Sequence, residues 1–127
     1  MVRKDVFEIA AYGTSLGLRM TLATNGSLVT PEVAGKMKES GIVRVSVSLD
    51  GVTSDIHDTF RGLPGAFDMA LEGMRILVAE GVPVQVNTTV AAMNISQMKL
   101  FPDFLEIGWL FSVCHLHGAA DVKEISL

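Results

Sequence analysis

One order of elements recurs along the chain: a helical pattern, then a glycine, then a short apolar strand. The glycines Gly17, Gly41 and Gly81 mark the three places where a helical segment gives way to a strand. A glycine readily takes the left-handed conformation that ends a helix. Helices that alternate with strands in this way are typical of βα units, which build a parallel sheet. The sequence therefore predicts an α/β fold with parallel strands.

Three helical segments are predicted, at about 5–16, 30–40 and 67–80. The second has the clearest start, because Thr30 can cap the first turn and Pro31 suits the first helical position. The third carries one apolar face, formed by Phe67, Ala70, Leu71, Met74, Leu77 and Val78. Apolar residues at this spacing predict a helix that packs on the sheet.

Two of the predicted strands, 42–49 and 84–90, alternate apolar and polar residues. The polar positions are Arg44, Ser46 and Ser48 in one strand, and Gln85, Asn87 and Thr89 in the other. Parallel strands covered by helices on both faces usually read as continuous apolar runs, so one face of this sheet is expected to meet a polar environment. Two interpretations remain open: a barrel interior that holds a polar ligand, or a sheet with one side facing solvent.

Polar side chains gather where the predicted strands end, at 24–26, 48–51 and 87–89. Ligands of parallel α/β folds lie at the carboxyl ends of the strands. These segments hold the candidate binding residues Thr24, Asn25, Ser48, Asp50 and Asn87. The Asn-Gly and Asp-Gly pairs there also form turns without binding anything.

Arg61 follows the second of these ends after a short helix that Thr53 is expected to cap. Its planar guanidinium can grip a carboxylate through two parallel hydrogen bonds, with the Ser48 hydroxyl on the same group. The alternative is a surface arginine paired with Asp55 or Asp58, which contributes at most about 1 kcal/mol to stability.

Composition excludes several classes of partner. The chain has 127 residues, a net charge of -4 and dispersed basic residues, so neither nucleic acid nor an anionic membrane surface is an expected partner. No run approaches the roughly 18–20 apolar residues of a membrane span, and no apolar signal core follows the N-terminus, so we expect a cytoplasmic protein. Cys114 is the single cysteine. It cannot form an internal disulfide or hold a metal alone, and no metal site is predicted.

The segments TNG (24–26), SLDG (48–51), HDTFRG (57–62) and NTTV (87–90) occur in an order and spacing that carry a resemblance. The chain is similar, over roughly residues 3–103, to the middle strands of radical S-adenosylmethionine (radical SAM) enzymes. Within them it is most similar to the haem-biosynthesis branch and its peptide-modifying relatives. The resemblance implies a partial (βα) TIM-type barrel over 1–108, and a parent chemistry of radical-mediated tetrapyrrole or peptide modification.

The resemblance also implies a partial S-adenosylmethionine site. Ser48 and Arg61 resemble the pair that binds the methionine carboxylate of the cofactor, and Asp50 lies beside its ribose. Thr24, Asn25 and Asn87 would line the pocket from neighbouring strands. No catalytic residue is assigned within this chain.

Two family motifs are missing. Members hold a [4Fe-4S] cluster on a Cys-x-x-x-Cys-x-x-Cys loop and grip the methionine amine with Gly-Gly-Glu-Pro, and the sequence contains neither. The chain begins about where members continue after the second motif. We therefore expect a fragment that has no ligands for the cluster and generates no 5′-deoxyadenosyl radical alone.

The C-terminal part departs from the family as well. A helix expected after Asn94 should kink or restart at Pro102, which lacks a backbone donor. The periodic pattern ends after Gly108, and residues 109–127 are predicted to be an atypical segment, either frameshifted or disordered. A frameshift, a deletion or a fragmentary gene would produce such an end.

A few barrel strands without their neighbours would expose two hydrogen-bonding edges, which invite pairing with another chain. We therefore expect a homodimer that joins sheet edges or swaps elements. The alternative function is a non-catalytic α/β module that self-associates or binds a partner through such an edge.

Overall fold

A computed structural model describes residues 3–105 and 109–116 and contains one four-stranded parallel sheet. The strands are β1 Met20–Thr24, β2 Ile42–Ser48, β3 Val84–Val90 and β4 Trp109–Leu116, and each pairs in parallel with the next along the chain. Consecutive parallel strands are the arrangement of a barrel segment. The structure thus confirms the predicted parallel α/β fold.

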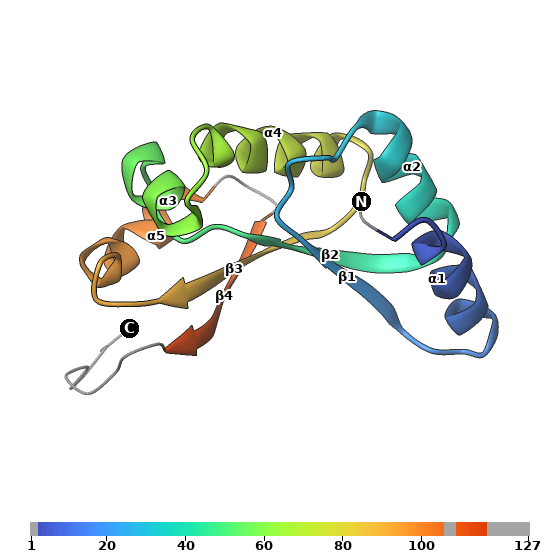
Figure 1. The fold of residues 1–127 in the computed structure, drawn as a ribbon. Coiled ribbons are helices and arrows are strands. Elements are labelled where there is room, and N and C mark those ends of the chain that lie inside the picture. The colour runs from blue at the N-terminus through green and yellow to red at the C-terminus, as the bar shows by residue number, and fades with distance from the viewer. Residues whose placement is uncertain (1–2, 106–108, 117–127) are drawn as a thin grey trace.

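Helices alternate with these strands (Figure 1). Their bounds are α1 Val6–Ser15, α2 Pro31–Glu39, α3 Ser54–Arg61, α4 Ala66–Ala79 and α5 Phe101–Phe104, with a 3-10 helix η1 at Ile95–Leu100. The three predicted helices are confirmed, and so is the capping of α2, where Thr30 Oγ1 accepts a hydrogen bond from Val33 N at 3.2 Å. Thr53 lies at the N-cap position of α3, as predicted, but its hydroxyl forms no capping hydrogen bond and accepts one from Gln97 Nε2.

The core lies between the sheet and the helices α1, α2 and α4, which pack on one of its faces. Five valines of β2 and β3 on this side of the sheet are at most 1% exposed: Val45, Val47, Val84, Val86 and Val90. Met74 and Leu77 of α4 are equally buried. This face contains most of the apolar side chains buried on folding, the main favourable contribution to stability.

The opposite face of the sheet is polar, as the alternation predicts. Parallel pairing places Ser46 beside Gln85 and Ser48 beside Asn87. The Gln85 amide joins two neighbours on this face, since its Oε1 accepts from Arg44 Nη1 at 3.0 Å and its Nε2 donates to Asn87 Oδ1 at 2.7 Å. The polar residues therefore form one connected surface above the sheet.

Differences appear after β3. The segment after Asn94 forms the 3-10 helix η1 and then restarts as α5, with Pro102 in its first turn, as its missing N–H requires. Residues 109–116, where the sequence pattern indicates no element, form β4. The expectation of disorder for the rest of the C-terminal segment concerns residues 117–127, outside the described residues. No helix of the described part is long and apolar enough to cross a membrane.

Candidate functional site

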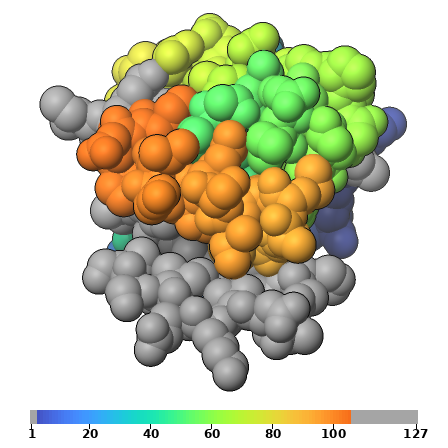
Figure 2. Space-filling model, turned by 90° about the vertical axis from the view of Figure 1, so that its left-hand side faces the viewer, coloured from blue at the N-terminus to red at the C-terminus, as the bar shows by residue number. Residues whose placement is uncertain are grey.

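The candidate site lies at the carboxyl ends of the strands. This end carries α3, which follows β2, and the segment that follows β3. Figure 2 looks onto it and shows α3 and the segment 91–105 side by side. Gln97 joins the two, because its Oε1 accepts a hydrogen bond from Val52 N at 2.9 Å and its Nε2 donates to Thr53 Oγ1 at 3.0 Å. Loops from two different strands are thereby held together.

Asp50 is the buried acid of this site, and its side chain is fully buried. Its Oδ1 accepts a hydrogen bond from Thr89 N at 2.8 Å, and its Oδ2 lies 2.6 Å from Arg61 Nη2. The second contact is an ion pair without a well-aligned N–H, since Oδ2 accepts no hydrogen bond from the described residues. Charge attraction therefore holds Arg61 here.

Arg61 folds back toward the end of β2, as the first of the two sequence interpretations requires. It pairs with Asp50, and the interpretation that pairs it with Asp55 or Asp58 is wrong. The Arg61 side chain remains 32% exposed. It also lines a hollow of about 110 Å³, together with Asn25, Ser27, His57, Leu63 and Ala66. One side of the guanidinium thus meets the buried acid, while another part of the side chain is open to a ligand.

His57 supports the turn at Asp50. Its buried Nδ1 accepts a hydrogen bond from the backbone N of Asp50 at 3.0 Å, which places the proton on Nε2 and leaves the ring neutral. Burial is the main cause that lowers the pKa of His57, opposed by the negative charge of Asp50 4.0 Å away. His57 therefore acts here as a neutral acceptor.

Asn94 is a residue of this site that the sequence does not point to. It is fully buried, and its Nδ2 donates to the backbone O of Asp50 and to that of Thr89, both at 2.8 Å. Its Oδ1 accepts from Ala91 N at 2.7 Å. One side chain thus ties the loop after β2 to the loop after β3. A lone asparagine reads in the sequence only as the start of a helix, because the Asp50 backbone that it binds lies 44 residues away along the chain.

The structure brings some of the predicted residues together and separates one. Ser48 and Asn87 are neighbours on the polar face, and Asn25 and Arg61 line the same hollow. Thr24 instead pairs in register with Val47, which puts it on the helix-covered face. Its hydroxyl accepts a hydrogen bond from Gly26 N at 3.2 Å. Thr24 shapes the turn after β1 and is not on the polar face.

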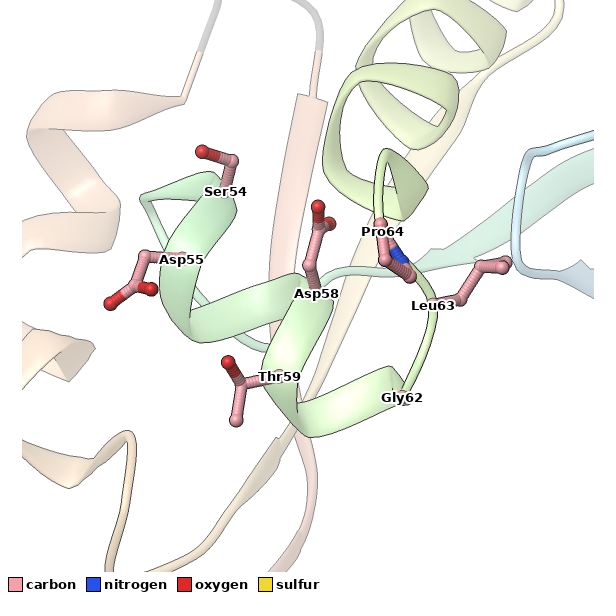
Figure 3. A pocket seen from close by; sticks show the side chains of 7 residues that line it. All are labelled: Ser54, Asp55, Asp58, Thr59, Gly62, Leu63 and Pro64. Atoms are coloured by element: carbon pink, nitrogen blue, oxygen red, sulfur yellow. The ribbon is translucent and has the colours of Figure 1, made fainter.

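A larger hollow, of about 480 Å³, lies beside α3 and the loop that follows it (Figure 3). Asp58, one of its lining residues, already has structural partners, because its carboxylate accepts hydrogen bonds from Gly65 N and Phe67 N at the start of α4. These bonds, mainly the one from Phe67, lower the pKa of Asp58. Asp58 therefore serves as a cap for α4.

No group of three or more His, Cys, Asp or Glu side chains in the described part of the chain could hold a metal ion. The polar groups that the site does offer are a guanidinium, a hydroxyl and amides. Such groups recognise a carboxylate and other hydrogen-bonding parts of a small ligand.

Three curated relatives are similar to this chain in sequence. The AdoMet-dependent heme synthase of Methanosarcina barkeri is 49% identical over 109 residues, which are 85% of this chain and 31% of the relative. The Fe-coproporphyrin III synthase of the same organism is 40% identical over 116 residues, 91% of this chain and 29% of the relative. Mycofactocin maturase MftC of Mycobacterium tuberculosis is 36% identical over 101 residues, which are 79% of this chain and 26% of the relative. The chain spans less than a third of the length of these relatives.

Solved structures share the fold. The crystal structure of Streptococcus suis SuiB has a TM-score of 0.71 at 17% identity and covers 95% of this chain and 28% of that one. The structure of anSMEcpe with bound AdoMet has a TM-score of 0.60 at 18% identity, and the match covers 88% of this chain and 32% of that one. The family model described as the Radical SAM superfamily matches residues 1–100. This chain therefore belongs to the radical SAM superfamily and has the partial (βα) barrel fold that its sequence predicts.

Proposed function

We propose that this chain is the part of a radical SAM enzyme that binds the amino-acid end of S-adenosylmethionine. The observation that carries the proposal is the position of Arg61, a partly exposed guanidinium held at the carboxyl end of β2. Ser48 ends the same strand, and Asn87 lies beside Ser48 on the polar face. We further propose that the whole enzyme carries out radical-mediated tetrapyrrole or peptide modification in the cytoplasm; the heme synthase and the Fe-coproporphyrin III synthase among the relatives support the tetrapyrrole chemistry.

The residues present fit the amino-acid end of this cofactor. A guanidinium has five N–H donors in a planar fork, so contact with Asp50 through Nη2 leaves donors for a second carboxylate. The Ser48 hydroxyl can donate to the same group, and the amides of Asn25 and Asn87 offer further donors and acceptors. S-adenosylmethionine supplies the radical chemistry of the family once it is reductively cleaved. The role of these residues is to hold and orient it.

The described residues do not fit a [4Fe-4S] cluster, because they contain no group of three or more His, Cys, Asp or Glu side chains that could hold a metal ion. Cluster irons are held by several cysteine thiolates. We propose that the cluster is bound by another part of the enzyme, and that this chain alone binds the cofactor without cleaving it.

Replacing Arg61 with alanine is expected to raise the Kd for S-adenosylmethionine about 10- to 100-fold. A hydrogen bond to a charged group contributes about 1.5–3 kcal/mol, and each 1.4 kcal/mol changes the Kd tenfold. Isothermal titration of the 127-residue chain measures the change. Arg19→Ala is the matched control, since Arg19 is an exposed arginine that precedes β1 at the other end of the sheet. An unchanged Kd for Arg61→Ala, or an equal loss in the control, would refute the assignment.

We also propose that copies of this chain associate through a sheet edge or by swapping elements. The observation that favours this is β1, which lies at the edge of the sheet and pairs only with β2 among the described strands. Leu18 and Leu28, which flank β1, are 59% and 61% exposed. Exposed edges with apolar neighbours promote pairing between chains. Light scattering at micromolar concentration is expected to give the mass of a dimer. A monomer that melts cooperatively would exclude this association. It would also exclude the alternative function in which a non-catalytic module acts by pairing its sheet edge with that of another copy.

A further inference from the structure

The ion pair between Asp50 and Arg61 suggests that Asp50 has a role in the site that it exerts through Arg61. We infer that Asp50 is a positioning residue: it fixes the guanidinium of Arg61 before the cofactor arrives, and Arg61 then bridges two carboxylates, that of Asp50 and that of the cofactor. This inference rests on the proposed function, because it assumes that Arg61 binds the carboxylate of S-adenosylmethionine.

Asp50 is itself held rigidly, as a positioning group must be. Its carboxylate accepts from Thr89 N in β3, its backbone N donates to His57 Nδ1 in α3, and its backbone O accepts from Asn94 Nδ2. The three partners come from three different segments of the chain. The carboxylate therefore has a fixed place from which it can orient a longer and more flexible side chain.

Charge keeps Arg61 on Asp50. The charged and titratable groups around the Asp50 carboxylate are Arg61 at 2.6 Å and His57 at 4.0 Å. Asp58 lies one turn before Arg61 on α3, and its carboxylate accepts hydrogen bonds from Gly65 N and Phe67 N at the start of α4. Since His57 is a neutral acceptor here, Arg61 supplies the positive charge that balances Asp50. Removing one member of a buried pair is strongly unfavourable, so Arg61 is expected to keep this contact when the cofactor binds.

The geometry leaves room for a second carboxylate on Arg61. Its side chain is 32% exposed and lines the hollow that Asn25 also lines, while the Asp50 side chain is fully buried on the other side of the contact. An arginine that is already ordered loses less conformational entropy on binding than a free one. Because the Asp50 side chain is fully buried, we expect it to strengthen binding through Arg61 and not through the ribose, beside which the resemblance places it. The opposite view is that Asp50 competes with the cofactor for Arg61.

A double-mutant cycle separates these views. The 127-residue chain and its Asp50→Asn, Arg61→Ala and doubly substituted variants are titrated with S-adenosylmethionine and with 5′-methylthioadenosine, which lacks the amino-acid end. Asparagine keeps the acceptor for Thr89 N but turns an NH₂ donor toward the guanidinium, so Arg61 should lose its place. We expect Arg61→Ala to cost at least about 10-fold in affinity for S-adenosylmethionine in the natural background, and at most about 3-fold in the Asp50→Asn background. The Kd of 5′-methylthioadenosine should not change.

Each outcome decides one question. If the loss from Arg61→Ala is undiminished or larger in the Asp50→Asn background, Asp50 does not position Arg61, and the proposed function stands. If the natural chain does not bind S-adenosylmethionine, or Arg61→Ala costs nothing, the proposed function fails and the inference with it. If Asp50→Asn weakens both ligands equally, its role is structural and the inference is wrong.

Arg61→Lys provides the test if Asp50→Asn does not fold. A lysine ammonium can balance the charge of Asp50 but lacks the planar fork that bridges two carboxylates. We expect a melting temperature near that of the natural chain and a loss of affinity for S-adenosylmethionine within about 3-fold of the loss for Arg61→Ala. Affinity retained in Arg61→Lys would overturn the bridging role of Arg61.

Discussion

Replacing Asn94 with alanine is expected to lower the free energy of unfolding by about 3–5 kcal/mol. The change removes three hydrogen bonds at once: two donated to the backbone O of Asp50 and Thr89, and one accepted from Ala91 N. A buried polar group left without a partner costs about 1–3 kcal/mol, and Asn94 is fully buried. Urea denaturation followed by circular dichroism measures the loss.

Asn25→Ala is the matched control for this variant. Asn25 is exposed, and its side-chain hydrogen bonds with the described residues stay within its own turn, where its Oδ1 accepts from Ser27 N and Ser27 Oγ. Surface substitutions usually change stability by no more than about 0.5 kcal/mol. Equal losses from the two variants would show that the two loops are not tied together by Asn94.

The sequence predicts those parts of this fold that depend on local patterns. Alternation in 42–49 and 84–90 identifies the polar face, because each strand points successive side chains to opposite sides and parallel pairing keeps Ser48 beside Asn87. Capping residues and glycines locate the helix ends for the same local reason, since Gly17, Gly41 and Gly81 all adopt positive φ.

What the sequence does not show depends on register and on distant partners. Thr24 is placed in the site by its position at a strand end, but β1 is short and its register shifts between Met20 and Thr21, so the face of Thr24 is not readable from its neighbours. The contacts of Asp50 with Thr89 and with Asn94 span 39 and 44 residues. The sequence supplies the residues of the site, whereas the fold decides which of them meet.

Gly73 brings α4 against the loop after β1, and Gly73→Ala is expected to lower the free energy of unfolding by about 2–3 kcal/mol. A Cβ at this position would collide with the backbone O of Gly26, and would lie 3.2 Å from its Cα. Gly26 is similarly close to α4, since a Cβ there would lie 3.1 Å from Ala70 Cα. A backbone carbonyl cannot rotate away as a side chain can, so the loss should lie in the upper part of the range for overpacked cores. Thermal and urea unfolding both report it.

Replacing a glycine with alanine in α2 should have the opposite effect on the free energy of unfolding. A Cβ on Gly35 would meet nothing within 4 Å, and alanine in the middle of a helix is about 0.5–1 kcal/mol more favourable than glycine. Gly35→Ala is therefore expected to stabilise the chain. Because Gly26 follows Asn25, Gly73→Ala should also weaken S-adenosylmethionine binding by displacing that loop, whereas Gly35→Ala should not. If both variants stabilise the chain equally, α4 does not hold the loop after β1 in place, and the position of Asn25 in the site must have another cause.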